Sequence, residues 1–324
     1  MKAKILIPQP VAEDGTDYLS EQGYELIYPG ASRREDILRS LAGCEAILLR
    51  GTLVDKEILE AGKLLKIVAC QGTGFDKADL EAAARRGIWV SGAPLSAACS
   101  VAEYAMTLIL MLAKEIPFYT AAVREGNFSP QNQRAGRELE NKTLGIIGLG
   151  RVGLSLAKKA AKGFNMDVFA YDPLCPPDRP PPEVSLLEDI ETVLKEADFV
   201  SLHAPNIPEV KKLFDAPRFE LMKTGAYFIN CSRPDLVDEG ALLRALEGGK
   251  IAGAALDVYD PQIPPGDNPL LRLPNVIATP RIASRTLEAD IKAALHAAME
   301  IHRVLSGERP RWPLNLPVFK GGQE

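Results

Sequence analysis

Short apolar runs alternate with longer amphipathic stretches through the first hundred residues of the chain. We expect strands there at residues 4–7, 24–27, 46–49, 67–69 and 88–90, and helices at residues 15–21, 33–41, 55–62 and 77–86. Strands and helices that alternate in this way are typical of an α/β unit built on a parallel sheet.

A second series follows a long apolar helix expected at residues 100–114 and an irregular stretch through Asn127 and Gln131. We expect its strands at residues 146–147, 167–171, 199–202, 227–230, 251–257 and 276–279, a spacing that parallel doubly wound sheets produce. A last helix, at 287–305, has no strand after it and can return to the first unit. A chain of 324 residues therefore predicts two domains, residues 1–98 with 287–324 and residues 99–286.

The most specific motif follows the strand at 146–147, which opens into Gly148-Leu149-Gly150-Arg151-Val152-Gly153 and then an expected helix over 152–162 closed by Gly163. In a G-x-G-x-x-G pattern the first glycine allows a tight turn, the second lets the backbone approach a diphosphate, and the third lets helix and strand pack closely. Asp172 ends the next strand, where a carboxylate accepts hydrogen bonds from ribose hydroxyls and repels a 2′-phosphate. The pattern predicts a site for NAD and not NADP.

Composition and charge narrow the classes of function. The formal net charge of −5 provides no basic surface for nucleic acid. The N-terminus lacks the long apolar core of a signal peptide, and the longest apolar stretch, residues 105–113, is too short to span a membrane. The five cysteines are widely separated and form no C-x-x-C pair, so we expect free thiols in a reducing cytoplasm and no metal site.

Further blocks of sequence occur in a defined order along the chain. They are Ser100-Val101-Ala102-Glu103-Tyr104, Leu202-His203-Ala204-Pro205, Ile229-Asn230-Cys231-Ser232-Arg233, Gly253-Ala254-Ala255-Leu256-Asp257-Val258 and Thr279-Pro280-Arg281-Ile282. Together with the glycine turn, they make nearly the whole chain resemble the D-isomer-specific 2-hydroxyacid dehydrogenase family, in its short, phosphoglycerate dehydrogenase-like form. The resemblance implies two α/β domains with doubly wound parallel sheets: a Rossmann NAD domain and a smaller flavodoxin-like substrate domain. It also implies NAD in the cleft between them, a small anionic substrate and a homodimer formed largely through the NAD domain.

The resemblance assigns catalytic roles to three positions, and the chain departs from the family at two of them. The family uses an arginine to hold the substrate carboxylate, a histidine to move a proton at the carbonyl oxygen, and a glutamate to orient that histidine. Arg233 matches the arginine, but Gln262 stands where the glutamate is expected and Arg281 where the histidine is expected. An arginine remains protonated and cannot shuttle a proton, whereas two arginines in one cleft can hold a substrate with two anionic groups.

The resemblance also assigns binding residues. Those expected at the cofactor are Gly148, Leu149, Gly150, Arg151, Val152, Gly153, Asp172, His203, Ala204, Pro205, Cys231, Ser232, Arg233, Asp257 and Ser284. Those expected at the substrate are Arg50, Gly72, Thr73 and Gly74. Asp257 would bind the nicotinamide carboxamide, or else only cap its strand. The Tyr104 hydroxyl could reach the cleft, or else Tyr104 packs at a hinge or a dimer contact. His203 would lie near the cofactor without being the acid.

Two hypotheses of function remain open. In the first, the chain is an NAD-dependent oxidoreductase in which Arg233 anchors the substrate carboxylate and Arg281 holds the reacting oxygen or a second anion. Gln262 positions Arg281, and water or another side chain carries the proton. An enzyme that recycles tightly bound NAD is a variant of this hypothesis. In the second, the chain is a catalytically disabled NAD-binding sensor or regulatory protein.

Overall fold

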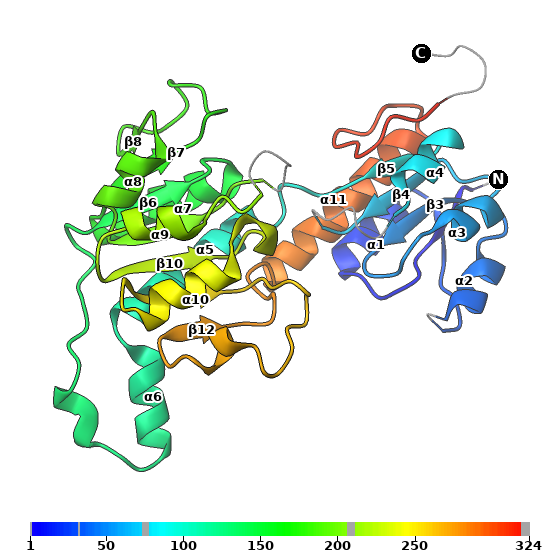
Figure 1. Ribbon diagram of the computed structural model, residues 1–324. Helices are drawn as coiled ribbons and strands as arrows, with labels where there is room; N and C mark the ends of the chain where they lie inside the picture. The colour runs from blue at the N-terminus through cyan, green and yellow to red at the C-terminus, as the bar shows by residue number, and fades with distance from the viewer. Residues whose placement is uncertain (1, 32, 73–77, 206–210, 319–324) are drawn as a thin grey trace. The chain divides into compact units, whose positions relative to one another are not determined.

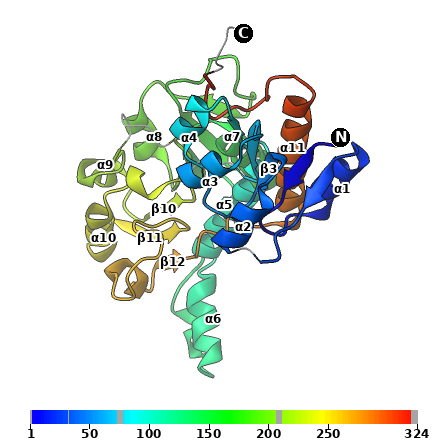
Figure 2. The ribbon, with the colours of Figure 1, turned by 90° about the vertical axis from the view of Figure 1, so that its right-hand side faces the viewer.

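The computed structural model describes residues 2–31, 33–72, 78–205 and 211–318, and the chain divides into two compact units. Unit 1 comprises Met1–Ala97 together with Arg285–Glu324, and unit 2 comprises Ala98–Ser284. Unit 1 is discontinuous in sequence because helix α11 (Leu287–Leu305) belongs to it and follows unit 2 along the chain. Both units are shown in Figures 1 and 2.

The described part of unit 1 holds a five-stranded parallel sheet in the order β2-β1-β3-β4-β5. The strands are β1 (Lys4–Leu6), β2 (Glu25–Ile27), β3 (Cys44–Leu49), β4 (Ile67–Cys70) and β5 (Trp89–Ser91). The helices besides α11 are α1 (Glu13–Glu21), α2 (Arg34–Ser40), α3 (Lys56–Ala61) and α4 (Leu80–Arg85). This strand order is that of flavodoxin-like doubly wound folds.

The strands of unit 1 are apolar on both sides because helices cover both faces of the sheet. Ile5, Leu48 and Ile67 pack with α1 and α11 on one face, whereas Ile47 and Val68 pack with α2, α3 and α4 on the other. Parallel sheets covered in this way have continuous apolar strands, which is the pattern found in the sequence.

The described part of unit 2 holds a seven-stranded parallel sheet in the order β12-β11-β10-β9-β6-β7-β8. The strands are β6 (Thr143–Ile147), β7 (Asp167–Tyr171), β8 (Val184–Leu186), β9 (Phe199–Leu202), β10 (Ala226–Asn230), β11 (Ile251–Leu256) and β12 (Val276–Ala278). The α-helices are α5 (Ala98–Ala113), α6 (Ile116–Arg124), α7 (Arg151–Phe164), α8 (Ile190–Glu196), α9 (Ala216–Leu221) and α10 (Glu239–Glu247). Counted from β6, the strand order is that of a Rossmann fold, so the predicted fold class of two doubly wound α/β domains is confirmed.

Helices cover both faces of the second sheet as well. Helices α5 and α7 pack on one face through Ala102, Ile109 and Leu156, and α8, α9 and α10 pack on the other through residues such as Val193 and Leu242. Since all seven strands run parallel, the loops after β6, β7, β9, β10, β11 and β12 meet at one edge of the sheet. These loops contain most of the residues predicted at the cofactor.

The structure corrects two local predictions. The stretch after α5, expected to be irregular, contains α6, which projects away from the sheet of unit 2 in Figures 1 and 2. The prediction that Gly163 caps α7 was wrong, because the helix continues through Phe164 and Asn165 ends it at φ 51°. Asparagine tolerates this left-handed conformation better than most residues with a side chain.

Within the described residues, no single helix is both long enough and apolar enough to cross a membrane. Helices α5 and α6 taken together meet the length and composition test, but they are bent by 66° at the break between them.

Candidate functional site

The glycine turn between β6 and α7 has the backbone geometry that its sequence predicts. Gly148 lies at φ 96°, and a Cβ there would stand 2.7 Å from the backbone nitrogen of Ala204. A Cβ on Gly153 would stand 2.2 Å from the carbonyl oxygen of Gly148, so only glycine permits this close approach of helix and strand. A Cβ on Gly150 would meet nothing within 4 Å, which leaves open space in front of the turn.

The N-terminus of α7 faces this space with free backbone donors. Gly150 is the N-cap residue and offers no side chain to the first turn of the helix. Arg151 is exposed and Val152 is half-buried, whereas Leu149 is fully buried. Unpaired N–H groups and the helix dipole favour an anion at such a terminus, so the turn fits a dinucleotide diphosphate.

Asp172 follows β7 and is fixed by two backbone hydrogen bonds. Its Oδ2 accepts from the Leu149 nitrogen at 2.9 Å, and its Oδ1 accepts from the Leu174 nitrogen at 2.9 Å. The residue remains partly exposed. A carboxylate has about four acceptor positions, so two remain for ribose hydroxyls in the place where the sequence predicts them.

The loops after β9 and β10 are joined by a network centred on Asn230, which is 1% exposed. Asn230 accepts from the Ser232 nitrogen at 2.9 Å and donates to the Arg233 carbonyl at 3.0 Å. The Ser232 hydroxyl donates to the Ala204 carbonyl at 2.9 Å. The buried amide therefore sets the path of the backbone at Arg233, whose partly exposed guanidinium donates to the Ser232 carbonyl at 2.9 Å.

The carboxylate of Asp257, at the end of β11, is only 2% exposed and accepts three hydrogen bonds. Its Oδ1 accepts from the Thr279 hydroxyl at 2.7 Å and the Ile282 nitrogen at 2.9 Å, and its Oδ2 accepts from the Ala283 nitrogen at 2.9 Å. Ser284, also predicted at the cofactor, follows this segment and is exposed. Asp257 therefore fastens residues 279–283 to the sheet edge, and its role toward nicotinamide stays a prediction.

Arg281 lies within the segment that Asp257 holds, in a left-handed conformation at φ 58°. Its side chain is exposed, and its backbone nitrogen donates to the Thr279 carbonyl at 3.0 Å. Such a φ costs a residue with a Cβ roughly 1–2 kcal/mol. The three hydrogen bonds that Asp257 accepts from this segment hold the backbone in this conformation.

Gln262 is also exposed, and in the described part of the chain no hydrogen bond joins its side chain to Arg281. Asp257 holds the segment that carries Arg281, and the positioning of Arg281 by Gln262 stays a prediction.

The predicted substrate residues of unit 1 are described in part. Arg50 donates to the Pro10 carbonyl at 3.1 Å, and its guanidinium lies 3.5 Å from the Asp290 carboxylate. Gly72 lies at φ 142°, and its carbonyl accepts from the Ala93 nitrogen at 2.7 Å. Thr73 and Gly74 lie outside the described residues.

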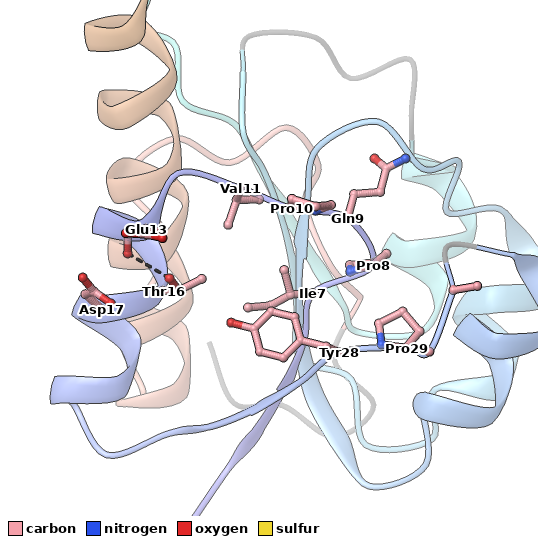
Figure 3. A pocket seen from close by; sticks show the side chains of 12 residues that line it. Ile7, Pro8, Gln9, Pro10, Val11, Glu13, Thr16, Asp17, Tyr28 and Pro29 are labelled. Carbon is pink, nitrogen blue, oxygen red and sulfur yellow. Dashed lines mark hydrogen bonds between the residues drawn. The ribbon is translucent and has the colours of Figure 1, made fainter.

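Unit 1 also contains a cavity of about 510 Å³ beside the carboxyl ends of β1 and β2, shown in Figure 3. The side chains of Ile7, Val11 and Tyr28 line it together with the α1 residues Thr16 and Asp17. None of the predicted cofactor or substrate residues lines this cavity. We therefore identify the candidate site from the loop residues at the sheet edges and not from the cavity.

His203 is a neutral side chain in this structure. Burial lowers its pKa from 6.5 to about 4, and its Nε2 lies 2.9 Å from the Ser201 hydroxyl. A histidine that is almost unprotonated at neutral pH is a poor proton donor. The lowered pKa therefore disfavours His203 as a substitute for the histidine that the resemblance implies at position 281.

Sequence reasoning did not single out Asn230 and Thr279 for a role, although both fell within the quoted blocks. Each residue acts through a partner distant in sequence or through the backbone of its own loop. Their places in the sequence could have identified them, because each is a polar residue at the end of an apolar strand.

Two glycine substitutions separate binding from folding at the turn. Gly150→Ala should weaken NADH binding at least about tenfold, because the new methyl group fills the space for the diphosphate, while unfolding changes by less than about 1 kcal/mol. The matched control Gly153→Ala should destabilise the fold by about 1–3 kcal/mol, because its methyl group meets backbone. NADH fluorescence titration and urea unfolding measure the two effects. Unchanged binding in Gly150→Ala would refute the assignment of the turn.

The lowered pKa of His203 predicts acid sensitivity. Between pH 6.5 and about 4 the unfolded chain binds more protons at this residue than the folded chain, so stability falls as the pH falls. One such group accounts for a slope of at most about 1.4 kcal/mol per pH unit. Urea unfolding from pH 4.5 to 7.5 should show a shallower slope for His203→Asn than for the native chain. Equal slopes would show that His203 titrates alike in both states.

Comparison with known proteins shows which family has this fold and these site residues. Residues 106–283 match the family described as "D-isomer specific 2-hydroxyacid dehydrogenase, NAD binding domain". The D-3-phosphoglycerate dehydrogenase of Archaeoglobus fulgidus is 40% identical over 318 residues, which cover 98% of this chain and 60% of that protein. The chain thus spans about 60% of the length of such curated relatives.

Solved structures show the same fold. The structure of D-2-hydroxyisocaproate dehydrogenase is 27% identical, with a TM-score of 0.87. The match covers 97% of this chain and 99% of that protein. The structure of D-lactate dehydrogenase with NAD⁺ from Lactobacillus jensenii is 28% identical, with a TM-score of 0.81. The match covers 96% of this chain and 99% of that protein. The match to the family extends over more than half of the chain and includes the glycine turn, Asp172, Arg233 and Asp257. The chain therefore belongs to the D-isomer-specific 2-hydroxyacid dehydrogenase family, and NAD is the cofactor of its unit 2.

Proposed function

We propose that the protein is an NAD-dependent oxidoreductase that interconverts a small 2-hydroxy acid and its 2-oxo acid, with a second anionic group on the substrate. The observation that carries this proposal is Arg281, held in a left-handed conformation by a buried carboxylate at the cofactor edge of the sheet. A conformation that costs energy and is fixed by its surroundings is a reason to assign function to a residue.

Arg233 and Arg281 follow β10 and β12, which flank β11 in the sheet. Neighbouring strands lie about 4.8 Å apart, so the two strand ends are separated by about 10 Å. Long, flexible guanidinium side chains starting that far apart can contact opposite ends of one small substrate. In this proposal Arg233 binds the carboxylate that the reacting carbon carries, and Arg281 binds the second anion through charge-assisted hydrogen bonds.

The names of the relatives support a second anion. D-3-phosphoglycerate carries a phosphate besides its carboxylate, and the Archaeoglobus fulgidus protein is named for acting on it. A guanidinium matches the geometry of phosphate and sulfonate oxygens as well as that of a carboxylate. The proposed substrate class is therefore a 2-hydroxy acid with a phosphate, sulfonate or second carboxylate.

Bound nicotinamide supplies hydride transfer at the substrate carbon. The chain's own residues hold the substrate in position and stabilise the charge that develops on its oxygen. The free backbone donors of α7 and the carboxylate of Asp172 would hold the diphosphate and the adenosine ribose, and the carboxylate favours NAD over NADP.

Removing the charge of Arg281 should discriminate between substrates. Arg281→Gln should raise KM for phosphohydroxypyruvate about 10–100-fold, because one charge-assisted interaction of about 1.5–3 kcal/mol is lost. Hydroxypyruvate, which lacks the phosphate, should change less than about threefold. Steady-state NADH oxidation measures both. Equal effects on the two substrates would contradict a role in binding the second anion.

The double variant Gln262→Glu with Arg281→His tests the competing hypothesis of a disabled protein. It restores the side chains that the family resemblance implies at both positions. If the native chain turns over no 2-oxo acid and the double variant does, the native protein is an NAD-binding sensor or regulator. If the native chain is active and the double variant loses that activity, the dehydrogenase assignment stands.

We further propose that the protein is a homodimer that pairs through α6. The helix has no buried residue, and Ile116 and Val123 are about half exposed, with Phe128 just beyond it 70% exposed. A projecting apolar helix of this kind is stabilised when a second copy covers it.

The five free thiols of the chain support the cytoplasm as the compartment of the protein.

Charges placed on the projecting apolar surface should separate the dimer. Val123→Glu with Phe128→Glu should convert a dimer into a monomer in sedimentation velocity, because buried unpaired carboxylates oppose association. Leu174→Glu, at a still more exposed apolar residue after β7, serves as the control and should leave the dimer intact. A native monomer, or a double variant that still dimerises, would rule out this interface.

A further inference from the structure

The chain returns to the sheet of unit 1 after α11. Residues 311–315, which we call the tail segment, run antiparallel along the edge strand β5 and are drawn in red in Figure 1. The Gly92 nitrogen donates to the Trp312 carbonyl at 3.2 Å, and the Leu314 nitrogen donates to the Val90 carbonyl at 2.8 Å. The tail segment is therefore fixed to the backbone at the point where β5 ends.

A buried carboxylate on α11 holds the tail segment from its other side. Glu300 is 1% exposed, and its Oε2 accepts from the Trp312 nitrogen at 2.9 Å. The His296 ring, one helical turn earlier, packs against the Trp312 ring with 5.0 Å between the ring centroids. Burial raises the pKa of Glu300, and the Trp312 hydrogen bond opposes this rise. A buried carboxylate is costly unless it is hydrogen-bonded, so Glu300 and the Trp312 N–H stabilise each other.

The backbone beyond β5 connects the tail segment with the predicted substrate loop. The Ala93 nitrogen donates to the Gly72 carbonyl at 2.7 Å. A Cβ on Gly92 would stand 3.3 Å from the Gly72 carbonyl oxygen and 3.5 Å from Cδ1 of Leu314. Gly92 thus lies in close contact with both the loop and the tail segment. A continuous series of contacts within unit 1 therefore runs from α11 to Gly72.

The direction of the Gly72 carbonyl matters for binding an anion. A peptide group is planar, so a fixed carbonyl also fixes the N–H group across the same peptide bond. Backbone N–H groups of such turns bind anions, and the family resemblance assigns Gly72 to the substrate. Gly72 lies at φ 142°, a conformation that a residue with a side chain rarely adopts. The hydrogen bond from Ala93 therefore orients a backbone donor that a substrate anion can use.

We propose, on the basis of the function assigned above, that Glu300 is a positioning residue that prepares the Gly72 loop for the substrate anion. Glu300 holds Trp312, and Trp312 holds Gly92. The adjoining Ala93 then fixes the carbonyl of Gly72. Because Glu300 is buried, it acts through Trp312 and not by contact with the substrate. Its loss should weaken substrate binding, whereas unit 2 should bind NADH as before.

Removal of the acceptor on α11 tests this proposal. Glu300→Leu should raise KM for phosphohydroxypyruvate about five- to tenfold, while kcat and the Kd of NADH change less than about twofold. Glu300→Gln keeps an oxygen that accepts from the Trp312 nitrogen, so its KM should stay within about twofold of the native value. A brace that only stabilises the fold would not change KM in this selective way. Unchanged KM in Glu300→Leu, or an equal rise in Glu300→Gln, would overturn the proposal.

The matched control is Ile301→Val, at the next residue of α11. Ile301 is fully buried and its apolar side chain accepts no hydrogen bond, so the variant loses packing without releasing the tail segment. Its KM for phosphohydroxypyruvate should remain within about twofold of the native value. A rise in KM equal to that of Glu300→Leu would show that any loss of packing at α11 has this effect, and would overturn the specific role of Glu300.

Gly92→Ala tests the same connection from its other end. Its methyl group would press on the Gly72 carbonyl oxygen, so KM should rise about five- to tenfold although Glu300 and Trp312 are unchanged. If Glu300→Leu does not fold, this variant decides the question. A native KM in Gly92→Ala would overturn the proposal.

A binding measurement separates the role of Glu300 from the proposed function. Oxamate, an inert analogue of a 2-oxo acid, is titrated into the NADH complex and followed by NADH fluorescence. Glu300→Leu should bind oxamate about five- to tenfold more weakly than the native protein, and Ile301→Val should bind it equally well. Weaker binding by Glu300→Leu without any native turnover would refute the dehydrogenase and still support the positioning role. Native affinity in Glu300→Leu, or no binding to the native protein, would overturn that role.

Discussion

The buried carboxylate of Asp257 is the interaction on which the candidate site depends. An ionised group that is 2% exposed is costly unless its oxygens are paired, and here the partners are a hydroxyl and two backbone N–H groups from residues 279–283. These hydrogen bonds fix the loop after β12 to the end of β11. They hold Arg281 at a positive φ. One carboxylate thus fixes the backbone around the cation that the proposal assigns to substrate binding.

The cofactor residues match the pattern that the family resemblance implies more fully than the catalytic residues do. The glycine turn keeps the two close approaches at Gly148 and Gly153 that exclude a side chain, and it keeps the open space at Gly150. At the catalytic positions, the family resemblance implies that Gln262 and Arg281 stand where proton-transfer residues are expected. The proposed function therefore keeps hydride transfer at the cofactor and assigns these two positions a different role.

Sequence alone predicted most of the fold because both sheets are parallel and their strands are nearly continuously apolar. The strands at 167–171 and 199–202 and the helix at 287–305 have the bounds that were expected. Helix α6 was missed because it is short and none of its residues is fully buried, so its sequence lacks the pattern of a core-facing helix. The end of α7 was misplaced because Gly163 is a stronger local signal than Asn165, although Asn165 adopts the left-handed conformation.

Less of the candidate site could be predicted from the sequence, because its residues are held by tertiary contacts. The positions of Arg233 and Arg281 followed from short motifs. The amide network of Asn230 acts through the backbone of its loop, and the hydrogen bond from Thr279 to Asp257 joins residues 22 positions apart. The positive φ of Arg281 was not predictable, since arginine has no preference for it. These contacts are determined by packing at the sheet edge and not by local residue type.

The most direct test of the account is a crystal structure of the protein in a dead-end complex with NADH and 3-phosphoglycerate. The account predicts the substrate carboxylate on Arg233, the phosphate within hydrogen-bond distance of the Arg281 guanidinium, and the three hydrogen bonds to Asp257 intact. A complex in which Arg281 points into solvent and the phosphate binds elsewhere would contradict it.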